Sequence, residues 1–103
     1  MGAETEFVNR LLSSQKRVHL STLPTPVEKP QGLQAMMPSI DLLVKRDDVM
    51  ELAMGGNKVR KLEFLMADAR SQGCNVVITT GDLHSNHTRL TAAAARKVGM
   101  KAI

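Results

Sequence analysis

The residues best suited to chemistry lie in segment 54–64, which reads Met-Gly-Gly-Asn-Lys-Val-Arg-Lys-Leu-Glu-Phe. Gly55–Gly56 can adopt positive φ and leaves room for a ligand close to the backbone. Asn57 is a favourable N-cap, so we expect a helix to begin there with Lys58 in its first turn. The positive end of the helix dipole and the like charge of Lys61 disfavour an ammonium group at that position. Lys58 is therefore a candidate nucleophilic amine.

A solvated basic helix start is the alternative interpretation of this segment, because Lys58 and Lys61 could simply face water. A Walker-type phosphate loop is excluded, since that pattern requires Ser or Thr directly after Gly-Lys. Here Asn57 precedes Lys58 and Val59 follows it. The residues alone leave the nucleophile and the solvated helix both open.

A second polar motif, residues 81–89, reads Gly-Asp-Leu-His-Ser-Asn-His-Thr-Arg and follows an apolar run. Ligands of open α/β sheets bind outside the carboxyl ends of strands, and a helix N-terminus offers amides to an anion. Ser85, Asn86 and His87 would add a hydroxyl, an amide and an imidazole to such a carboxylate or phosphate site. The alternative is simple capping by Ser85, with Asn86 and His87 solvated. A metal site built from His84 and His87 is disfavoured, because no further ligands lie nearby in sequence.

The elements that would position these motifs alternate between strands and helices. Apolar residues predict a strand at 40–46 that is buried on both faces, and a second one at 75–80. A helix is expected from Asn57 to Gln72, with Gly73 as its C-cap and an apolar stripe of Val59, Leu62, Leu65, Met66 and Ala69. Ser85 would cap another helix with its body at 88–98 and Gly99 after it. This order predicts an α/β fold with a parallel sheet and crossover helices.

The two ends of the chain have their own predictions. Residues 4–16 carry Phe7, Val8, Leu11 and Leu12 at helical spacing, which indicates a short packing helix. Prolines at 24, 26 and 30 predict an extended crossing segment over 22–30. Residues 100–103 read as the start of another strand, so the chain is expected to end inside a strand. We therefore expect a piece of a longer protein or one segment of a split protein.

The composition limits the classes of function. The 103 residues are 43% hydrophobic and 23% charged, as in globular proteins. The net charge of +4 is spread among acidic residues, and Phe7 and Phe64 are the only aromatic residues. A nucleic-acid interface is therefore not expected. The single cysteine, Cys74, excludes a disulfide within the chain. The absence of a signal peptide pattern and of a membrane-length apolar run makes cytoplasmic residence the default expectation.

At residues 55–64 and 84–89 the chain resembles the D-cysteine desulfhydrase and 1-aminocyclopropane-1-carboxylate deaminase family. Leu-Pro-Thr-Pro at 23–26 and Val-Lys-Arg-Asp-Asp at 44–48 also match the opening of that family, so the resemblance covers about residues 20–103. It implies a pyridoxal-phosphate enzyme of the tryptophan-synthase β-like fold (fold type II), incomplete in this chain. Residues 1–53 would contribute to the large domain, and residues 54–103 would begin the small α/β domain.

The resemblance also implies roles for individual residues. Lys58 matches the Schiff-base lysine, which binds the cofactor and moves the proton at the substrate α-carbon. Asn86 matches the residue that hydrogen-bonds the pyridoxal ring oxygen, and Asn57 and Lys61 would lie around the cofactor without touching the substrate. Because these are matches to family motifs, each is an expectation about this chain.

The substrate side of the implied site involves the second motif. Ser85 matches the serine beside the substrate, and the amides from Ser85 to His87 would receive the substrate carboxylate. His87 favours the desulfhydrase branch, because deaminases of the cyclopropane acid tend to have glutamine there. Asp82 departs from the family, which usually has a small apolar residue or glycine at this position.

The implied activity is elimination from a small, D-cysteine-like amino acid to give ammonia and a keto acid, with a homodimer as the full-length state. The 103 residues alone are expected to be inactive, because the glycine-rich phosphate loop of the family is not among them. A rival interpretation remains open: a non-catalytic α/β fragment that only pairs with a partner chain.

Overall fold

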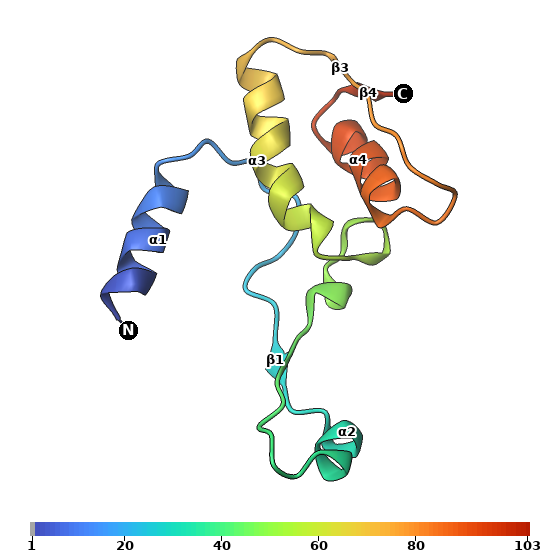
Figure 1. Cartoon of the computed structure of the whole chain (residues 1–103). Helices are drawn as coiled ribbons and strands as arrows, with labels where there is room; N and C mark the ends of the chain where they lie inside the picture. The colour runs from blue at the N-terminus through green and yellow to red at the C-terminus, as the bar shows by residue number, and fades with distance from the viewer. Residues whose placement is uncertain (1) are drawn as a thin grey trace.

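The computed structural model describes residues 2–103, and Figure 1 shows the order of the elements along the chain. The helices are α1 (Ala3–Ser13), α2 (Gln31–Met36), α3 (Lys58–Ser71) and α4 (Asn86–Lys97). Two 3₁₀ turns, η1 (Asp47–Val49) and η2 (Leu52–Met54), precede α3. The short strands are β1 (Val27–Glu28), β2 (Val44–Lys45), β3 (Val76–Val77) and β4 (Lys101–Ala102).

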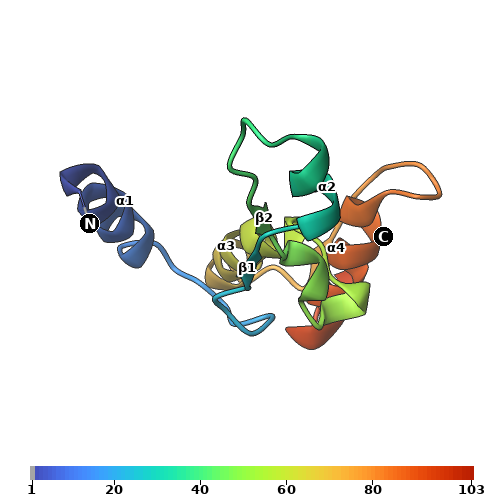
Figure 2. The same ribbon diagram turned by 90° about the horizontal axis from the view of Figure 1, so that it is seen from below.

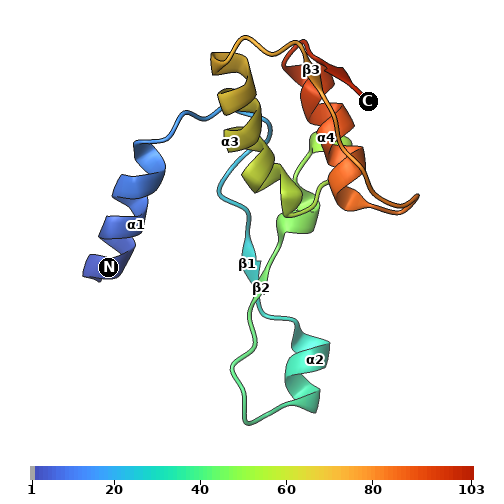
Figure 3. The same cartoon turned by 45° about the horizontal axis from the view of Figure 1, so that its top comes forward.

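The core lies where α3 packs against α4, and both helices begin at the end of this pair that is nearer to β1 (Figures 1 and 3). Leu62 and Leu90 face each other from the two helices at about 1% exposure or less. Burying apolar side chains of this size from two facing helices is the main stabilising contribution available to this chain. The other buried members of this core are Leu20, Met50, Val59, Met66, Ala94, Ala95 and Met100.

The stripe predicted for α3 is correct except at one position. Val59, Leu62 and Met66 are buried, whereas Leu65 is 51% exposed. Leu65 follows Leu62 by three residues but points toward a groove of about 550 Å³ that Leu12 and Phe64 also line. The predicted C-cap is confirmed, because Gly73 has a φ of 74° directly after the last turn of α3.

The unit β3–α4–β4 confirms the parallel crossover predicted for the last third of the chain. Val76 pairs with Lys101 and Val77 with Ala102, in parallel. Backbone hydrogen bonds continue this ladder beyond the two strands, since Thr79 N donates to Ile103 O at 2.9 Å. The prediction of a strand buried on both faces is wrong for β3, whose residues are exposed or half-buried. Within residues 2–103, β3 pairs with β4 alone in a two-stranded sheet, so it is an edge strand and not a central one.

The prediction for residues 40–46 is also wrong. Only Val44–Lys45 forms a strand, and it pairs antiparallel with β1 in a separate two-stranded ladder. The Gln34 side chain explains the shortening, because its amide bonds the carbonyl of Ile40 and its oxygen accepts from Leu42 N at 2.8 Å. The backbone before β2 is thus tied to α2 and has no strand partner.

The helix at the N-terminus forms as predicted, over Ala3–Ser13, but its packing role is wrong. None of its residues is buried, and Phe7 and Leu11 are 61% and 51% exposed. Figures 1 and 2 show α1 standing apart from the α3–α4 core, and Figure 1 shows α2 beyond the β1–β2 ladder, at the far end from that core. The radius of gyration is 16.6 Å, whereas a compact chain of this length has one of about 13 Å. The molecule therefore exposes faces that a compact fold of this length would bury.

The segment that joins α1 to β1 is fixed to the core by Glu63 of α3. This carboxylate is fully buried, accepts from Leu20 N at 3.1 Å, and pairs with Arg17. Lys97 Nζ of α4 donates to Leu20 O at 2.8 Å. The buried carboxylate of Glu63 is tolerated because Leu20 N and Arg17 replace the water that it has lost.

Within residues 2–103, no helix has the length and apolar character that crossing a membrane requires.

Candidate active site

The turn before Lys58 has an unusual backbone. Ala53, Met54, Gly55 and Gly56 have φ values of 44°, 69°, 75° and 131°. A Cβ on Gly55 would lie 2.3 Å from Asp48 O, so this position accepts only glycine without a backbone shift. Ala53 and Met54 are neighbouring non-glycine residues with positive φ, so their backbone is strained. The surrounding contacts must stabilise this conformation.

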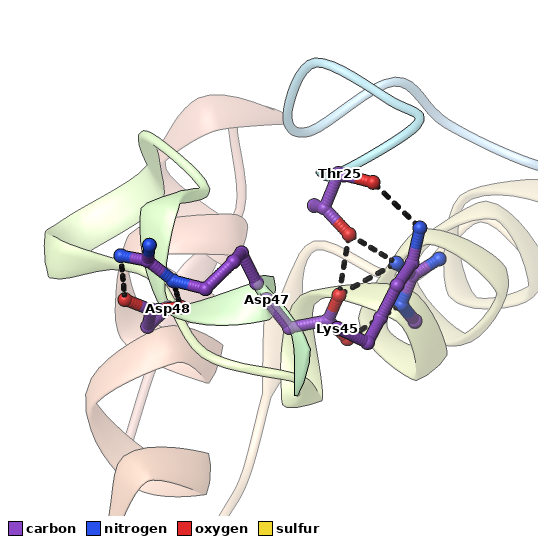
Figure 4. A network of polar contacts seen from close by, with 6 residues as sticks. Thr25, Lys45, Asp47 and Asp48 are labelled. Atoms are coloured by element: carbon purple, nitrogen blue, oxygen red, sulfur yellow. Dashed lines mark hydrogen bonds and ion pairs between the residues drawn. The ribbon is translucent and has the colours of Figure 1, made fainter. Parts of the chain in front are cut away.

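Asp47 supplies much of that support (Figure 4). Its backbone oxygen accepts from Gly56 N at 3.0 Å. Its carboxylate accepts two bonds from Arg60 of α3, both at 2.7 Å, and a third from the Thr25 hydroxyl at 2.7 Å. Lys45 Nζ donates to Thr25 O at 2.6 Å. The Arg60 guanidinium, more than any other neighbour, lowers the pKa of Asp47 to about 2. We call these four side chains the Asp47 cluster.

The start of α3 differs from the predicted cap. Asn57 occupies the N-cap position, but its side chain makes no cap bond. With φ −61° and ψ −19° its backbone is already helical, whereas side-chain capping requires an extended conformation. Lys58 is the first residue of α3 and is half-buried, while Lys61 one turn later is exposed. Lys58 thus lies in the first turn as predicted, although the capping side chain was wrongly assigned.

The second motif forms the start of α4. Ser85 caps it as predicted, because its hydroxyl oxygen accepts from Thr88 N at 3.2 Å. The helix begins at Asn86, two residues before its predicted body. Asp82 closes the preceding turn, with its backbone oxygen accepting from Ser85 N at 3.1 Å and its carboxylate from His84 N at 3.2 Å. Asp82, the residue that departs from the family, therefore stabilises the turn before α4.

This turn changes one expectation about the anion site. The Ser85 amide is already bonded to Asp82 O, so it is not available to a ligand. Asn86 and His87, as the first two residues of α4, lack intrahelical acceptors for their amides. A carboxylate would therefore be received by these two amides and the Ser85 hydroxyl, whose hydrogen is not needed for the cap.

The two motifs meet in space. Arg89 Nη2 donates to Gly55 O at 2.9 Å, and its Nη1 donates to Asn86 Oδ1 at 3.1 Å. A Cβ on Gly56 would lie 3.3 Å from Leu90 Cδ1, so α4 also packs directly against the glycine pair. We call the region where residues 55–61 meet residues 85–89 the Lys58 corner. A depression of about 520 Å³ opens beside it, lined by Met54, Leu83, His84, Ser85, Thr88 and Arg89.

The His87 side chain on α4 is affected by the charges of the two lysines on α3. Burial, followed by the positive charges of Lys61 and Lys58, holds the pKa of His87 below its usual value of 6.5. The imidazole is therefore neutral at pH 7. Its buried Nδ1 has no hydrogen-bond partner within residues 2–103. A buried polar atom without a partner is unfavourable, so this atom is a candidate ligand contact.

Several residues in and around the corner had no individual role in the sequence-based prediction. Arg89 closed the second motif, and Asp47 lay in the segment 44–48 that matched the family, but neither was given a function of its own. Arg60 and Thr25 are far from Asp47 in sequence, and no local pattern indicates that they meet. Gly81 also matters, because a Cβ there would lie 2.8 Å from Ser85 Oγ.

Comparison of the sequence with models of protein families identifies the family of this chain. The family described as "Pyridoxal-phosphate dependent enzyme" matches residues 18–103, which include both motifs. The chain belongs to this family. The suspected cofactor is thereby confirmed at the level of the family, which depends on pyridoxal phosphate.

Individual relatives show which members of this family the chain is similar to. A Pyrococcus abyssi protein named "Putative 1-aminocyclopropane-1-carboxylate deaminase" is 47% identical over 96 residues, which are 93% of this chain and 29% of that protein. A D-cysteine desulfhydrase of Salmonella paratyphi A is 48% identical over 87 residues, or 84% of this chain and 26% of the enzyme. The resemblance inferred from the motifs is therefore confirmed. The chain spans less than a third of the length of these relatives.

A solved structure described as an ACC deaminase homologue matches the whole chain with a TM-score of 0.87 and 42% identity, and the match covers 30% of that structure. This confirms the predicted fold class, the α/β fold of pyridoxal-phosphate enzymes, present here in part. The assignment of residues 1–53 and 54–103 to two domains stays a prediction.

The donors of the Lys58 corner fit such a cofactor. Lys58 provides an amine for an aldehyde, and Lys61 a cationic neighbour for an anionic group. The Asn86 and His87 amides and the Asn86 side chain provide neutral donors. The expected room for a ligand beside the glycine pair is absent, because atoms of Asp48 and Leu90 fill the space where a Cβ on Gly55 or Gly56 would lie, so these glycines serve the packing of the turn. The residues present are thus chemically suited to the group.

Proposed function

We propose that this chain forms part of a pyridoxal-phosphate deaminase or desulfhydrase that acts on a small, D-cysteine-like amino acid and releases ammonia and a keto acid. The observation that carries this proposal is the bond from Arg89 to Gly55 O at 2.9 Å, which holds the Lys58 turn against the start of α4. The depression beside the corner is lined by Met54 from the first motif and by Ser85, Thr88 and Arg89 from the start of α4, so both motifs border the same opening. The names of the relatives, a deaminase and a desulfhydrase, support the reaction class.

Each residue of the corner has a role in the proposal. When bound, pyridoxal phosphate supplies the electron sink for bond cleavage at the amino acid. Lys58 would hold the cofactor through its aldehyde and would move the proton at the substrate α-carbon. Asn86 would donate to the cofactor's ring oxygen, and Asn57 and Lys61 would lie around the cofactor.

The amino acid is oriented from α4. The amides of Asn86 and His87 bind its carboxylate, supported by the positive end of the helix dipole. The Ser85 hydroxyl lies beside this group and can donate to the substrate or exchange a proton with it. A neutral His87 adds no positive charge of its own beside the lysines of α3.

Selective modification of lysine tests the proposal on the chain itself. The protein is incubated with pyridoxal phosphate, reduced with borohydride and digested, and the adduct at each lysine is measured by mass spectrometry. We expect the adduct to concentrate at Lys58 and to disappear in Lys58→Arg. Exposed Lys101 serves as the internal reference, and Lys101→Arg as the matched control. Equal modification of Lys58 and Lys101 would contradict the proposal.

Turnover requires the part of the fold that lies outside these 103 residues. The chain is therefore mixed or co-expressed with the remaining part of the Pyrococcus abyssi relative, and D-cysteine is offered. Release of hydrogen sulfide and ammonia that depends on Lys58 is the expected result. The homodimer and the cytoplasmic residence stay predictions, which the mass of the active complex and cell fractionation can check.

A second function, a non-catalytic α/β piece that pairs with a partner chain, is favoured by the exposed apolar side chains. Ile78 and Ile103, next in sequence to β3 and β4, are 79% and 75% exposed, and Leu83 in the loop before α4 is 96% exposed. Such surface fits a protein partner. A stable complex in the same mixture, without any product from D-cysteine, would favour this function over the enzyme.

A further inference from the structure

Arg89 is the side chain that joins the two motifs, and its geometry is specific. It lies in the first turn of α4 and is half-buried. One terminal nitrogen donates to Asn86 Oδ1 at 3.1 Å and the other to Gly55 O at 2.9 Å. The fork of the guanidinium therefore spans from a ligand-binding side chain on α4 to the turn three residues before Lys58.

The chemistry of the guanidinium decides which way Asn86 faces. Arginine has only donors, so it can bond the amide of Asn86 only through the oxygen. The nitrogen end of that amide, with its two donors, must then point away from Arg89. Asn86 is exposed, so this nitrogen is accessible to a ligand.

The donor character of Asn86 agrees with its surroundings. The amides of Asn86 and His87 at the helix start are donors as well, and Lys58 and Lys61 contribute positive charge to the same corner. A ligand placed there meets donors from several directions. Oxygen acceptors, above all anionic oxygens, are therefore the complementary groups.

We propose that Arg89 is a positioning residue that orients the Asn86 amide so that it presents only donors to the ligand, and that holds the Gly55–Lys58 turn against α4. The proposal rests on the proposed function in one respect, since the ligand whose oxygen Asn86 meets is taken to be pyridoxal phosphate. The orientation of Asn86 itself does not depend on that function.

Asn86→Asp separates orientation from structural support. An aspartate keeps the acceptor for Arg89 and turns the bond into an ion pair, so the melting temperature should stay the same or rise. It removes the donors, however, and presents a negative charge to an anionic oxygen. We therefore expect the Lys58 adduct with pyridoxal phosphate to fall about tenfold relative to the Lys101 adduct. An Asn86→Asp protein that modifies Lys58 as readily as the unaltered chain would overturn the proposal.

A second measurement uses no cofactor. In Arg89→Lys, which keeps the charge but loses the fork, the side-chain amide signals of Asn86 should shift in a ¹H–¹⁵N spectrum, because the bond to Asn86 Oδ1 is lost. Arg96→Ala, an exposed arginine in the last turn of α4, is the matched control and should leave them unchanged. Unchanged Asn86 signals in Arg89→Lys would overturn the orientation directly.

The two readouts separate the two proposals. If Lys58 is not modified in the unaltered chain, the proposed function fails, and the Asn86 signals alone decide the role of Arg89. If Lys58 is modified but Asn86→Asp and Arg89→Lys change neither the adduct nor the signals, the function stands and the positioning role is wrong.

Discussion

At the scale of single residues, the corner differs from a solvated surface mainly through His87. Its imidazole is half-buried beside Lys58 and Lys61, and its Nδ1 lies in a buried position. The sequence indicated His87 as an imidazole of the anion site, as an amide at the substrate carboxylate and as a mark of the desulfhydrase branch, but not as a neighbour of the two lysines. Its side chain gains importance because α3 brings two lysines toward it, which no local pattern predicts.

The lowered pKa of His87 makes a prediction for stability. The unfolded chain binds a proton at this histidine below about pH 6.5, whereas the folded chain does so only at lower pH. The free energy of unfolding should therefore decrease as the pH falls below about 6.5. Urea unfolding at pH 7.5 and pH 5.5 measures this decrease, which should be smaller in His87→Gln. His84→Gln, at an exposed position, is the control, and an equal change in both variants would contradict the prediction.

At the scale of elements, α3 and α4 could be predicted within two residues, because apolar periodicity, glycine stops and Ser85 define them locally. The strand at 40–46 could not, since an apolar run does not tell which strand it pairs with, and here Gln34 holds its first half. Asn57 shows the same limit, because a good capping residue was found at a position whose backbone is already helical. The link from Asp47 to Arg60 depends on tertiary packing alone.

The Asp47 cluster gives a prediction at this scale. Asp47→Asn loses the ionic part of two bonds from Arg60 and weakens the support of the Gly55–Gly56 turn. At pH 7 the free energy of unfolding should fall by about 2 kcal/mol. Because the pKa of Asp47 is lowered to about 2, this contribution is fully present above about pH 4 and is lost as the pH falls toward 2.

Asp41→Asn is the matched control for that variant. Asp41 forms an ion pair with Lys29 at 2.7 Å, but both side chains are more than 60% exposed. Its loss should change the free energy of unfolding by less than about 1 kcal/mol. Urea titrations of the two variants check the difference, and equal effects would show that the Asp47 cluster is no more than a surface ion pair.

At the scale of the whole molecule, one small core between α3 and α4 carries the stability. The exposed α1 and the open β3–β4 pair contribute little apolar burial. The parallel crossover and the family were predictable, because motif order and spacing are local information. The separation of α1 from the core was not, since amphipathicity indicates a buried face without showing what covers it.

This small core predicts a strong position dependence of leucine substitutions. Leu90→Ala, at a fully buried position, should lower the free energy of unfolding by about 2–5 kcal/mol and unfold much of the chain. Leu33→Ala, at a position 53% exposed, should cost less than about 1 kcal/mol. Circular dichroism during urea unfolding compares them, and similar midpoints would place the stabilising core elsewhere.

The central claim is that Lys58 and the start of α4 form one site, and amide spectra of the reduced Lys58 adduct test it most directly. The chain is modified with pyridoxal phosphate and borohydride, and its ¹H–¹⁵N spectrum is compared with that of the unmodified chain. We predict the largest shifts at the amides of Asn86 and His87 and at the Asn86 side chain, with none at α1 or α2. A fully modified Lys58 that leaves the Asn86 and His87 signals in place would contradict the account.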